Sequence, residues 1–504
     1  MKTLLLLPTQ TLPAIHPTTH PHLSLPPLPH PQPQPPTPPN QPRRTIYQLR
    51  AKYLFDSVSR VLVPNQVVTV DESSGVVLGV CEGGDEDEGE GWKKMLGLGE
   101  QTGDVKVEKI DLGDMVLLPG FVDVHVHFFL HPYSETSWDD QLLKESLAER
   151  TIRATNHARQ TLLAGFTTVR DLGTEGAFDA DIGLRKCLSG PNPIIPGPRY
   201  YCSTRAIIST GSYGPQSALY PSQNGVDGVM GAQPVDGVDE CVKEVRKQIG
   251  AGADWIKIYA DYRIRARQSD VSSTLSTKSI STFTPTELAA LVNTAHSRGV
   301  KVAAHANSAP AISHLLDAHV DSIEHGSGLF DASTCDKSLI RKFLRNRERT
   351  TWVPTLSAYY TSWLNAGGSE APSDSYASEA WRRCQEAFEE VVMRHAPMFD
   401  NIAVGGDTGV YEHGRNGLEM VLMRRYGAGW ERVLGWGTLG GWKCVRGREE
   451  TPFGAIRVGW AADLVGIQGK LDGSADEFEQ AVMEGVSFVM KGGRIYKRDG
   501  RQVV

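Results

Sequence analysis

The stretch from Leu118 to His127, LPGFVDVHVH, decides the fold of this 504-residue chain. Side chains of a β-strand alternate between two faces, so Asp123, His125 and His127 share one face and valines occupy the other. A strand with polar groups inward and apolar groups outward is typical of a closed barrel wrapped by helices. Two imidazoles one pleat apart can bind one metal ion, although an ordinary half-buried strand can also carry two histidines by chance.

The composition is that of an ordinary globular protein, with 40% apolar and 22% charged residues. A chain of this length can hold two or three domains, or one α/β barrel with an accessory sheet. Its net charge of -7 argues against nucleic acid as the main partner, and no apolar run approaches the roughly 20 residues of a membrane helix. The seven cysteines never form a Cys-x-x-Cys pair, so we expect reduced thiols and a cytoplasmic location.

The beginning of the chain differs from the rest. Residues 8–42 are rich in proline and contain four interspersed histidines, a composition that cannot bury a core. We therefore expect residues 1–44 to form a disordered Pro-rich segment. The apolar residues 4–7 resemble the start of a secretion signal, but Pro8 ends that run before it reaches the roughly 7 to 15 residues that a signal requires.

Both ends of the remaining chain carry short strand patterns. Residues 45–118 contain five short apolar runs, which are too few for a barrel, and residues 451–504 contain several more. We expect these two segments to form one small β-sandwich around a barrel made by residues 119–450. The acidic and Gly-rich residues 82–103 are expected to be a solvated loop.

Between the two ends, strand patterns alternate with helical ones, as in a (β/α)8 TIM barrel of the α/β class. The segments that follow the first strand and read as strands two to eight are 165–173, 199–208, 253–260, 300–305, 321–326, 351–356 and 402–407. Helices are expected over 139–163, 239–250 and 284–298. The last of these begins with Thr284, Pro285 and Glu287, which predict a capping box.

Polar side chains that can bind metal lie on these strands. Alternation places Lys257 on the inward face of its strand, where a lysine is costly unless an acid pairs with it or a reaction neutralises it. His305, His325 and Asp407 each end a later strand, at the edge where active sites of such barrels lie. Each of these residues alone can be an ordinary core residue.

Taken together, the polar residues resemble the ligand set of the binuclear-metal amidohydrolase superfamily. They occur in the order in which that superfamily carries its ligands, on strands one, four, five, six and eight: His125, His127, Lys257, His305, His325 and Asp407. Residues 138–140, 161–171 and 406–410 resemble the branch that contains imidazolonepropionase-like proteins, Xaa-Pro dipeptidases and ochratoxinase. The resemblance covers nearly everything after residue 45.

The resemblance implies how two metal ions would be bound. One ion would be bound by His125, His127 and Asp407, and the other by His305 and His325. A carbamate, formed from CO2 and the amine of Lys257, would bridge the two ions. Nitrogen and carboxylate ligands suit zinc, and manganese and iron remain open. Burial near cations lowers the pKa of a lysine, which would provide the free amine.

The activity that the resemblance implies is hydrolysis of a small molecule. The substrate would be an N-acyl amino acid or a dipeptide-like compound, whose non-cyclic amide C–N bond is cleaved through a metal-bridging hydroxide. Asp407 would be the catalytic proton carrier. Two alternatives stay open, namely a mononuclear hydrolase of a cyclic amide with an unmodified Lys257, and an inactive scaffold protein. A homo-oligomer is also possible.

Several loop residues are candidates for substrate binding. Tyr259 and Tyr262 follow Lys257 closely and can bind a substrate carboxylate. His413 lies in a loop that should overhang the site, where it binds substrate or braces the loop. Arg263 and Arg265 can bind a carboxylate, or they belong to a solvated basic loop. The residues 269–281 are rich in serine and threonine and are a candidate mobile lid.

Two features depart from the resemblance. Relatives often carry a histidine in the Gly-rich turn after strand three, where this chain has Tyr213. Residues 434–450 are rich in glycine, tryptophan and arginine, whereas relatives have a helix that contains alanine and asparagine. This composition suggests a local loss of packing or an error in the sequence, but it does not affect the proposed ligands.

Overall fold

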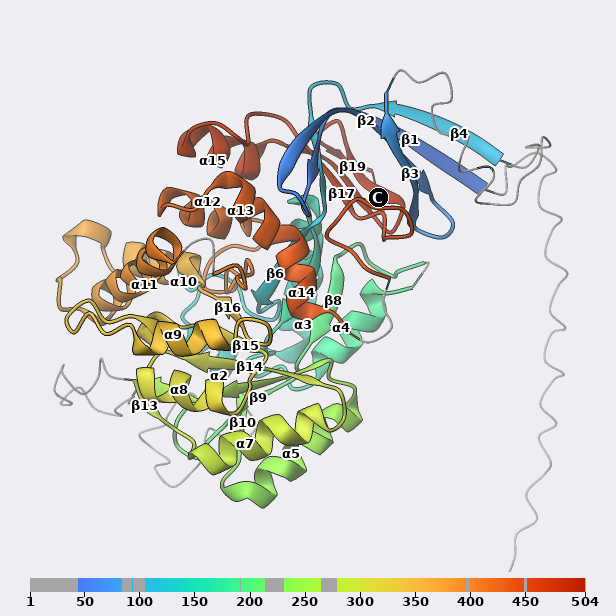
Figure 1. The fold of residues 1–504 in the computed structure, drawn as a ribbon. Coiled ribbons are helices and arrows are strands. Elements are labelled where there is room, and N and C mark those ends of the chain that lie inside the picture. Colours follow the sequence, from blue (N-terminus) through green and yellow to red (C-terminus); the bar gives the residue numbers. More distant parts are fainter. Residues whose placement is uncertain are drawn as a thin grey trace, which may run out of the picture. The chain divides into compact units, whose positions relative to one another are not determined.

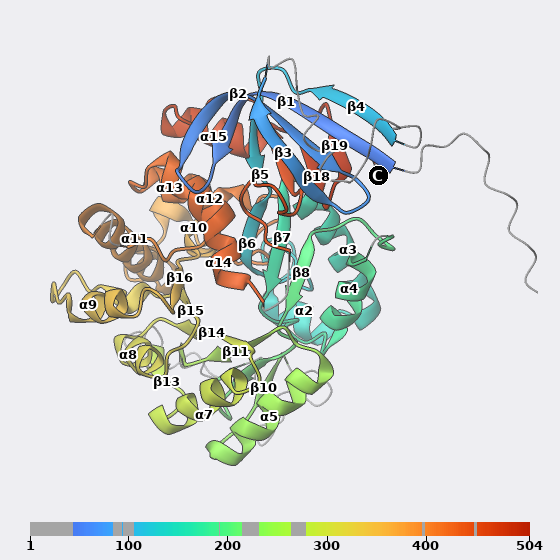
Figure 2. The same cartoon turned by 45° about the vertical axis from the view of Figure 1, so that its right-hand side comes forward.

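The computed structural model describes residues 44–83, 93, 105–190, 192–213, 231–263, 279–395, 399–447 and 451–503, and these form a mixed α/β fold (Figures 1 and 2). Almost all of the segment 1–44, most of the acidic loop 82–103, Arg265 and the greater part of 269–281 lie outside the described residues. Within the described ranges, every helix is too short or too polar to cross a membrane.

The two ends of the described chain share one nine-stranded sheet (Figure 1). Its strands are β1 (Arg44–Asp56), β2 (Val61–Asp71), β3 (Val76–Glu82), β4 (Val105–Asp111), β5 (Val116–Pro119), β17 (Leu464–Ile467), β18 (Val486–Lys491), β19 (Arg494–Arg498) and β20 (Arg501–Gln502). Strand β5 pairs antiparallel with β17, and Leu118 lies opposite Val465. Apolar side chains from both ends, including Leu49, Val68 and Phe488, pack into one cluster on this sheet. Neither end can therefore complete the sheet alone.

The middle of the chain forms two parallel sheets. One consists of β6 (Phe121–Val126), β7 (Phe166–Asp171) and β8 (Arg199–Cys202). The other contains, in spatial order, β10 (Ala232–Pro234), β9 (Ala206–Ile208), β11 (Trp255–Tyr259), β14 (Lys301–Ala306), β15 (Ser322–His325) and β16 (Thr351–Val353). A short antiparallel pair joins β12 (Asp261–Arg263) to β13 (Ser279–Ser281). Strands β6, β7 and β11 are buried along their whole length, as expected for parallel strands covered on both faces.

The predicted eighth strand lies between these two parallel sheets. Ile402 forms a parallel bridge with Trp352 of β16, and Thr408 forms another with Val126 of β6. The backbone N–H of Val124 also donates to the carbonyl of residue 404, at 2.9 Å. Residues 402–408 therefore connect an edge of the six-stranded sheet to an edge of the three-stranded one.

The helices follow the strands along the chain and cover them (Figure 2). They are α2 (Trp138–Lys144), α3 (Leu147–Leu163), α4 (Ala180–Leu188), α5 (Gly237–Ala251), α7 (Pro285–His296), α8 (Ala309–Asp317), α9 (Ser338–Arg345), α10 (Leu356–Asn365), α11 (Tyr376–Arg394), α12 (Gly417–Arg425), α13 (Trp430–Gly435), α14 (Gly441–Val445) and α15 (Ala475–Glu484), with short 3-10 turns η1 (Ser327–Leu329) and η2 (Gly368–Glu370). The predicted capping box of α7 is confirmed, because Thr284 and Glu287 each accept a hydrogen bond from the backbone N–H of the other.

Three predicted elements are divided or shorter in the structure. The helix expected over 139–163 is broken into α2 and α3, because the hydroxyl of Ser146 accepts from the N–H of Glu149 and caps a new helix. The third strand is split into β8 and β9 around Thr204, whose φ of 60° is left-handed. The seventh strand ends at Val353, since Thr355 is also left-handed and α10 begins directly after it.

The Gly-rich residues 434–447 are well packed, contrary to the expected loss of packing. They form the end of α13, a π-helical turn η3 (Trp436–Gly440) and α14. A Cβ atom on Gly441 would lie 2.4 Å from the Cβ of Val122, and one on Gly440 would lie 3.0 Å from the carbonyl of Ile402. The glycines are therefore needed because they let this helical segment approach β6 and the eighth strand closely.

Candidate metal centre and substrate pocket

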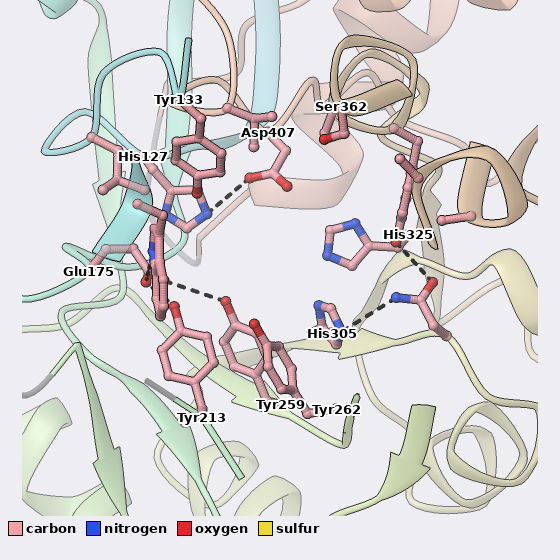
Figure 3. Close-up of a pocket in the computed structure, with 18 of the residues that line it drawn as sticks. His127, Tyr133, Glu175, Tyr213, Tyr259, Tyr262, His305, His325, Ser362 and Asp407 are labelled. Carbon is pink, nitrogen blue, oxygen red and sulfur yellow. Dashed lines mark hydrogen bonds and ion pairs between the residues drawn. The ribbon is translucent and has the colours of Figure 1, made fainter. Parts of the chain in front are cut away.

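The carboxyl ends of the parallel strands surround a pocket of about 380 Å³ (Figure 3). Five of the six predicted ligands line it, namely His125, His127, His305, His325 and Asp407. The predicted substrate-binding residue Tyr259 lines it too, and Lys257 is fully buried on the same strand as Tyr259. The strand register brings the groups together, because Tyr259 lies opposite His305 and Ala306 lies opposite His325.

Three of the predicted ligands form a compact cluster, which we call the histidine cluster: His125, His325 and Asp407. The nitrogen and carboxylate oxygen atoms that they offer all lie within 4.8 Å of one another, close enough to bind one ion together. His127 adjoins the cluster, since its Nε2 lies 3.2 Å from Oδ1 of Asp407. The Nε2 of His125 lies 3.5 Å from the same oxygen.

The outer ring nitrogens of these histidines are held by hydrogen bonds. Nδ1 of His125 lies 2.9 Å from a carboxylate oxygen of Glu324, and Nδ1 of His127 lies 2.8 Å from the carbonyl of Gly173. Nδ1 of His325 lies 2.7 Å from the hydroxyl of Thr355. Histidines that bind metal are commonly oriented in this way, with the second nitrogen held by a neighbouring acceptor. Nε2 is therefore the atom that each of the three presents to the pocket.

His305 and Lys257 complete the predicted set. Nε2 of His305 lies 3.4 Å from the side-chain nitrogen of Asn307, so its Nδ1 is the nitrogen left for a ligand. The ring of His305 contacts that of His325, with 4.5 Å between centroids. The Lys257 amine is buried without a hydrogen-bond partner among the described residues. Burial lowers its pKa to about 8. An orphaned buried amine beside these ligands fits a group that is neutralised when the site is complete.

A buried ion pair behind the histidine cluster was not predicted from the sequence. The guanidinium of Arg170 donates to Glu324 at 2.9 Å and to the carbonyl of Val124 at 2.6 Å, and both charged side chains are inaccessible to solvent. Burial alone would raise the pKa of Glu324, but the charge of Arg170 and the hydrogen bond from His125 lower it to about 2. Glu324 therefore stays ionised and fixes the ring of His125.

Asp407 is ionised for a similar reason. Burial on its own would raise the pKa of this carboxyl group, but the charge of His125 and the hydrogen bond with His127 lower it well below its usual range. The backbone at Asp407 and at His325 is left-handed, with φ of 62° and 68°. Such conformations cost about 1 to 3 kcal/mol for a residue other than glycine and concentrate at functional sites. The N–H of Asp407 donates to the carbonyl of His125, which helps to hold it there.

Comparison with known proteins identifies the family. Residues 116–496, most of the chain, match the model of the amidohydrolase family. The chain belongs to this family. The resemblance inferred from the ligand order is thereby confirmed, and this amidohydrolase is a hydrolase that acts on carbon–nitrogen bonds. Members of the family generally bind metal ions, which agrees with the histidine cluster.

Relatives cover most of the amidohydrolase chain. The ochratoxinase of Aspergillus niger is 25% identical over 405 residues, which are 76% of each chain. The solved structure of an Xaa-Pro dipeptidase with methionine bound in its active site is 25% identical, has a TM-score of 0.69, and is matched over 90% of this chain and 100% of that one. The structure of A. niger ochratoxinase gives a TM-score of 0.68 at 22% identity, over 90% of this chain and 96% of that one.

A second group of pocket residues surrounds Glu175, and we call it the Glu175 cluster: Trp138, Glu175, Tyr213 and Tyr259. Figure 3 shows Glu175, Tyr213 and Tyr259 on one side of the pocket. The carboxylate of Glu175 accepts from Nε1 of Trp138 at 3.3 Å and from the hydroxyl of Tyr259 at 3.4 Å. It also accepts a close hydrogen bond from the hydroxyl of Tyr213. Sequence reasoning noted Tyr213 only as a departure and missed Glu175, although an acid just after the second strand lies at the same edge as the ligands.

His413 does not line this pocket. Its Nε2 donates to the carbonyl of Leu130 at 2.9 Å, and its ring stacks on that of His157 with 4.1 Å between centroids. Since Leu130 follows the metal-binding strand closely, these contacts favour the bracing role for His413 over contact with substrate. The side chain of Arg263, like the whole of Arg265, lies outside the described part of the chain.

Proposed function

We propose that this amidohydrolase cleaves the non-cyclic amide C–N bond of a dipeptide-like compound or an N-acyl amino acid, with the help of two divalent metal ions. The observation that carries the proposal is the convergence of five predicted ligands at one pocket, with the orphaned amine of Lys257 buried on the strand that bears Tyr259. A volume of about 380 Å³ suits a molecule of this size. The names of the relatives, a dipeptidase and an ochratoxinase, support a small substrate.

The proposal includes the fold. Residues 119–450 would form a (β/α)8 barrel, and residues 45–118 with 451–504 would form a small β-sandwich. Support comes from the two parallel sheets, whose edges are linked by residues 402–408. The nine-stranded sheet made from both chain ends, and the TM-scores with proteins of this superfamily, also support this division. The sequence-based boundaries are kept as proposed.

The six predicted ligands fit two metal ions of the zinc type. His125, His127 and Asp407 would bind one ion, and His305 and His325 the other, with Lys257 as a carbamate between them. Bound divalent ions would polarise the scissile carbonyl and lower the pKa of water in the pocket. Metal ligands must be neutral imidazoles, and burial lowers the pKa of His125 to about 4 and that of His305 well below its usual value. At His127 the neighbouring Asp407 outweighs burial and raises the pKa to about 9, so metal binding there would release a proton.

The chain's own groups would carry the proton. Hydrolysis forms a C–O bond from water, breaks the C–N bond, and moves one proton from the water to the departing amine. Asp407 would accept that proton on a carboxylate oxygen and return it; support comes from its ionised state, its place in the pocket wall and its contact with His127. Glu324 and Arg170 would hold His125 in place, and Tyr259, which lines the pocket, would help to orient the substrate.

An assay with the zinc-loaded protein tests the proposal. We expect hydrolysis of members of a panel of dipeptides and N-acyl amino acids, together with two metal ions per chain by elemental analysis. One metal ion per chain together with cleavage of a cyclic amide would support the mononuclear alternative instead. A metal-loaded protein that cleaves nothing in either set would support the inactive scaffold.

A further inference from the structure

The Glu175 carboxylate is held ready for a ligand. Glu175 is 2% exposed to solvent, and its backbone conformation is left-handed, with φ of 49°. Three neutral donors surround it, namely the indole N–H of Trp138 and the hydroxyls of Tyr213 and Tyr259. An ionised carboxylate offers about four acceptor positions. Three donors therefore fix its orientation and leave room for one more.

No positive charge is paired with this carboxylate. Among the residues that the structure describes, none forms an ion pair with Glu175. The nearby guanidinium of Arg150 donates instead to the carbonyls of Phe129 and Thr174, each at 3.0 Å. The amine of Lys257 makes no hydrogen bond to Glu175 or to any other described residue. Arg150, His127 and Lys257 interact with Glu175 through their charges, but the groups hydrogen-bonded to it are neutral. A cationic donor could therefore still form a direct ion pair with this buried carboxylate.

The carboxylate lies close to the metal ligands. An ideal Cβ atom on Gly173 would lie 3.7 Å from Oε1 of Glu175 and 3.9 Å from Cε1 of His127. Both atoms are thus within 4 Å of one point. A group bound by Glu175 would therefore sit beside the ligand strand, where the scissile bond must be. Glu175 and the metal ligands line the same pocket, so the group that Glu175 would bind belongs to the part of the substrate near the scissile carbonyl.

The neighbouring rings favour an ammonium group over a metal ion or a neutral donor. The ring centroids of Tyr213 and Tyr259 are 4.8 Å apart, and those of Trp138 and Tyr213 are 5.3 Å apart. All three side chains line the pocket next to the carboxylate. These side chains turn their N–H and O–H groups to the carboxylate, and among the described residues no second acid, histidine or cysteine joins Glu175 in a metal-binding group, so the site suits an amine better than a metal ion. In this interpretation Tyr213, which replaces the histidine that relatives often carry, orients the Glu175 carboxylate.

We propose that Glu175 binds the free α-ammonium group of the substrate, so that the enzyme acts on dipeptides and other aminoacyl amides in preference to N-acyl amino acids. This inference rests on the proposed amide hydrolysis and narrows its substrate class. Under this proposal, Glu175 contacts the substrate and determines the preference for a free α-ammonium group. The chemical step is carried out by the metal-site residues.

Matched substrate pairs test the inference. Alanyl and propionyl derivatives of glycine, leucine, phenylalanine and proline differ only in the ammonium group. For the zinc-loaded wild-type enzyme we expect kcat/KM at least about tenfold higher for the alanyl member of each cleaved pair, since a hydrogen bond between charged groups contributes this much or more. The preference should fade above about pH 8, where the α-amine loses its proton.

Variants of Glu175 separate specificity from structure. Glu175→Gln should lower kcat/KM for alanyl substrates about 10- to 100-fold, mainly through KM, and change that for propionyl substrates less than threefold. Glu175→Asp keeps the charge and should retain part of the preference. Glu149→Gln removes an exposed carboxylate at the start of α3 and serves as the control for loss of charge. An equal fall for both members of each pair would mean a structural role only.

The outcomes distinguish the two proposals. If the wild-type enzyme cleaves both series equally, or prefers the propionyl series, the ammonium site is excluded while amide hydrolysis stands. If neither series is cleaved by protein that contains two metal ions, the proposed function itself fails, and the ammonium site fails with it. Because the wild-type ratio is informative by itself, the test does not depend on the variants folding.

Discussion

The histidine cluster and the Glu175 cluster line the same pocket but are built differently. The strand ends position His125 and His325, and each outer ring nitrogen has its own acceptor, in Glu324 and Thr355. In the Glu175 cluster, Glu175 and Tyr213 come from loops, while Trp138 begins α2 and Tyr259 ends β11. These side chains are positioned by one another through the carboxylate. The first arrangement suits chemistry shared by a family, and the second suits recognition of a particular substrate.

Removing the acid of the histidine cluster should have the largest effect. We expect Asp407→Asn to keep the fold and the metal but to lower kcat about 1000-fold or more, because an amide cannot accept and return the proton. The change should be equal for alanyl and propionyl substrates, since Asp407 acts on the bond common to both. Steady-state kinetics, elemental analysis and thermal unfolding check this. Wild-type-like rates would remove Asp407 from the chemistry.

Replacing the orphaned lysine should separate activity from stability. Lys257→Met keeps the length of the side chain and removes an amine that is fully buried and unbonded within the described residues. We expect a loss of bound metal and a fall in kcat of about 100-fold or more, because removing a ligand, or a group that holds a ligand in place, weakens metal sites strongly. In the presence of a chelator, the free energy of unfolding should rise by about 1 to 3 kcal/mol, since a desolvated charge is removed.

Urea unfolding and elemental analysis provide the measurements for Lys257→Met. Lys301→Met is a useful comparison, because the amine of Lys301 is also largely buried but donates to the carbonyl of Cys444 at 2.6 Å. That variant should be destabilised rather than stabilised. A variant at position 257 that loses stability without metal would show that the amine has a partner in the folded protein.

Sequence reasoning reached the histidine cluster because strand periodicity and strand ends determine its geometry. His125 and Lys257 alternate with apolar residues on buried strands, so their direction follows from their position in the strand. It could not reach the contact between Glu175 and Tyr213, since both residues lie in loops, 38 positions apart, and no periodicity relates them. The same holds for Arg170 and Glu324, which are 154 positions apart.

The fold was predictable to a similar degree. Strand order along the chain and the capping box at Thr284 follow from local patterns. The break at Ser146 and the close approach of Gly441 to Val122 depend on tertiary contacts. A high glycine content usually indicates a loop, so residues 434–447 were expected to be poorly packed. In the structure these glycines let a helical segment lie close to its neighbours.

Removing the carboxylate that holds His125 should have an intermediate effect on activity. Glu324→Gln leaves the charge of Arg170 buried without its partner and weakens the hold on His125. We expect the free energy of unfolding to fall by about 3 to 5 kcal/mol and kcat/KM to fall about 10- to 100-fold for both substrate series. Glu386→Gln, which removes an exposed partner of Arg382, should change stability by less than about 1 kcal/mol. Similar small effects from both variants would contradict the importance of the buried pair.

The smallest effect on activity is expected at the stacked histidines, which belong to neither cluster. Burial lowers the pKa of His157 from 6.5 to about 4, although its Nδ1 hydrogen-bonds the carbonyl of Phe128. Between these pH values the unfolded chain binds a proton that the folded protein does not. Stability from this group is therefore complete above about pH 6.5 and is lost as the pH falls to 4, by about 3 kcal/mol.

His157→Gln keeps a donor for Phe128 and should remove this part of the acid destabilisation in urea unfolding, while kcat/KM at pH 7.5 changes less than threefold. An unchanged pH dependence of stability would contradict the assignment of this acid destabilisation to His157. A large change in the alanyl preference would show instead that the stacked histidines affect the pocket.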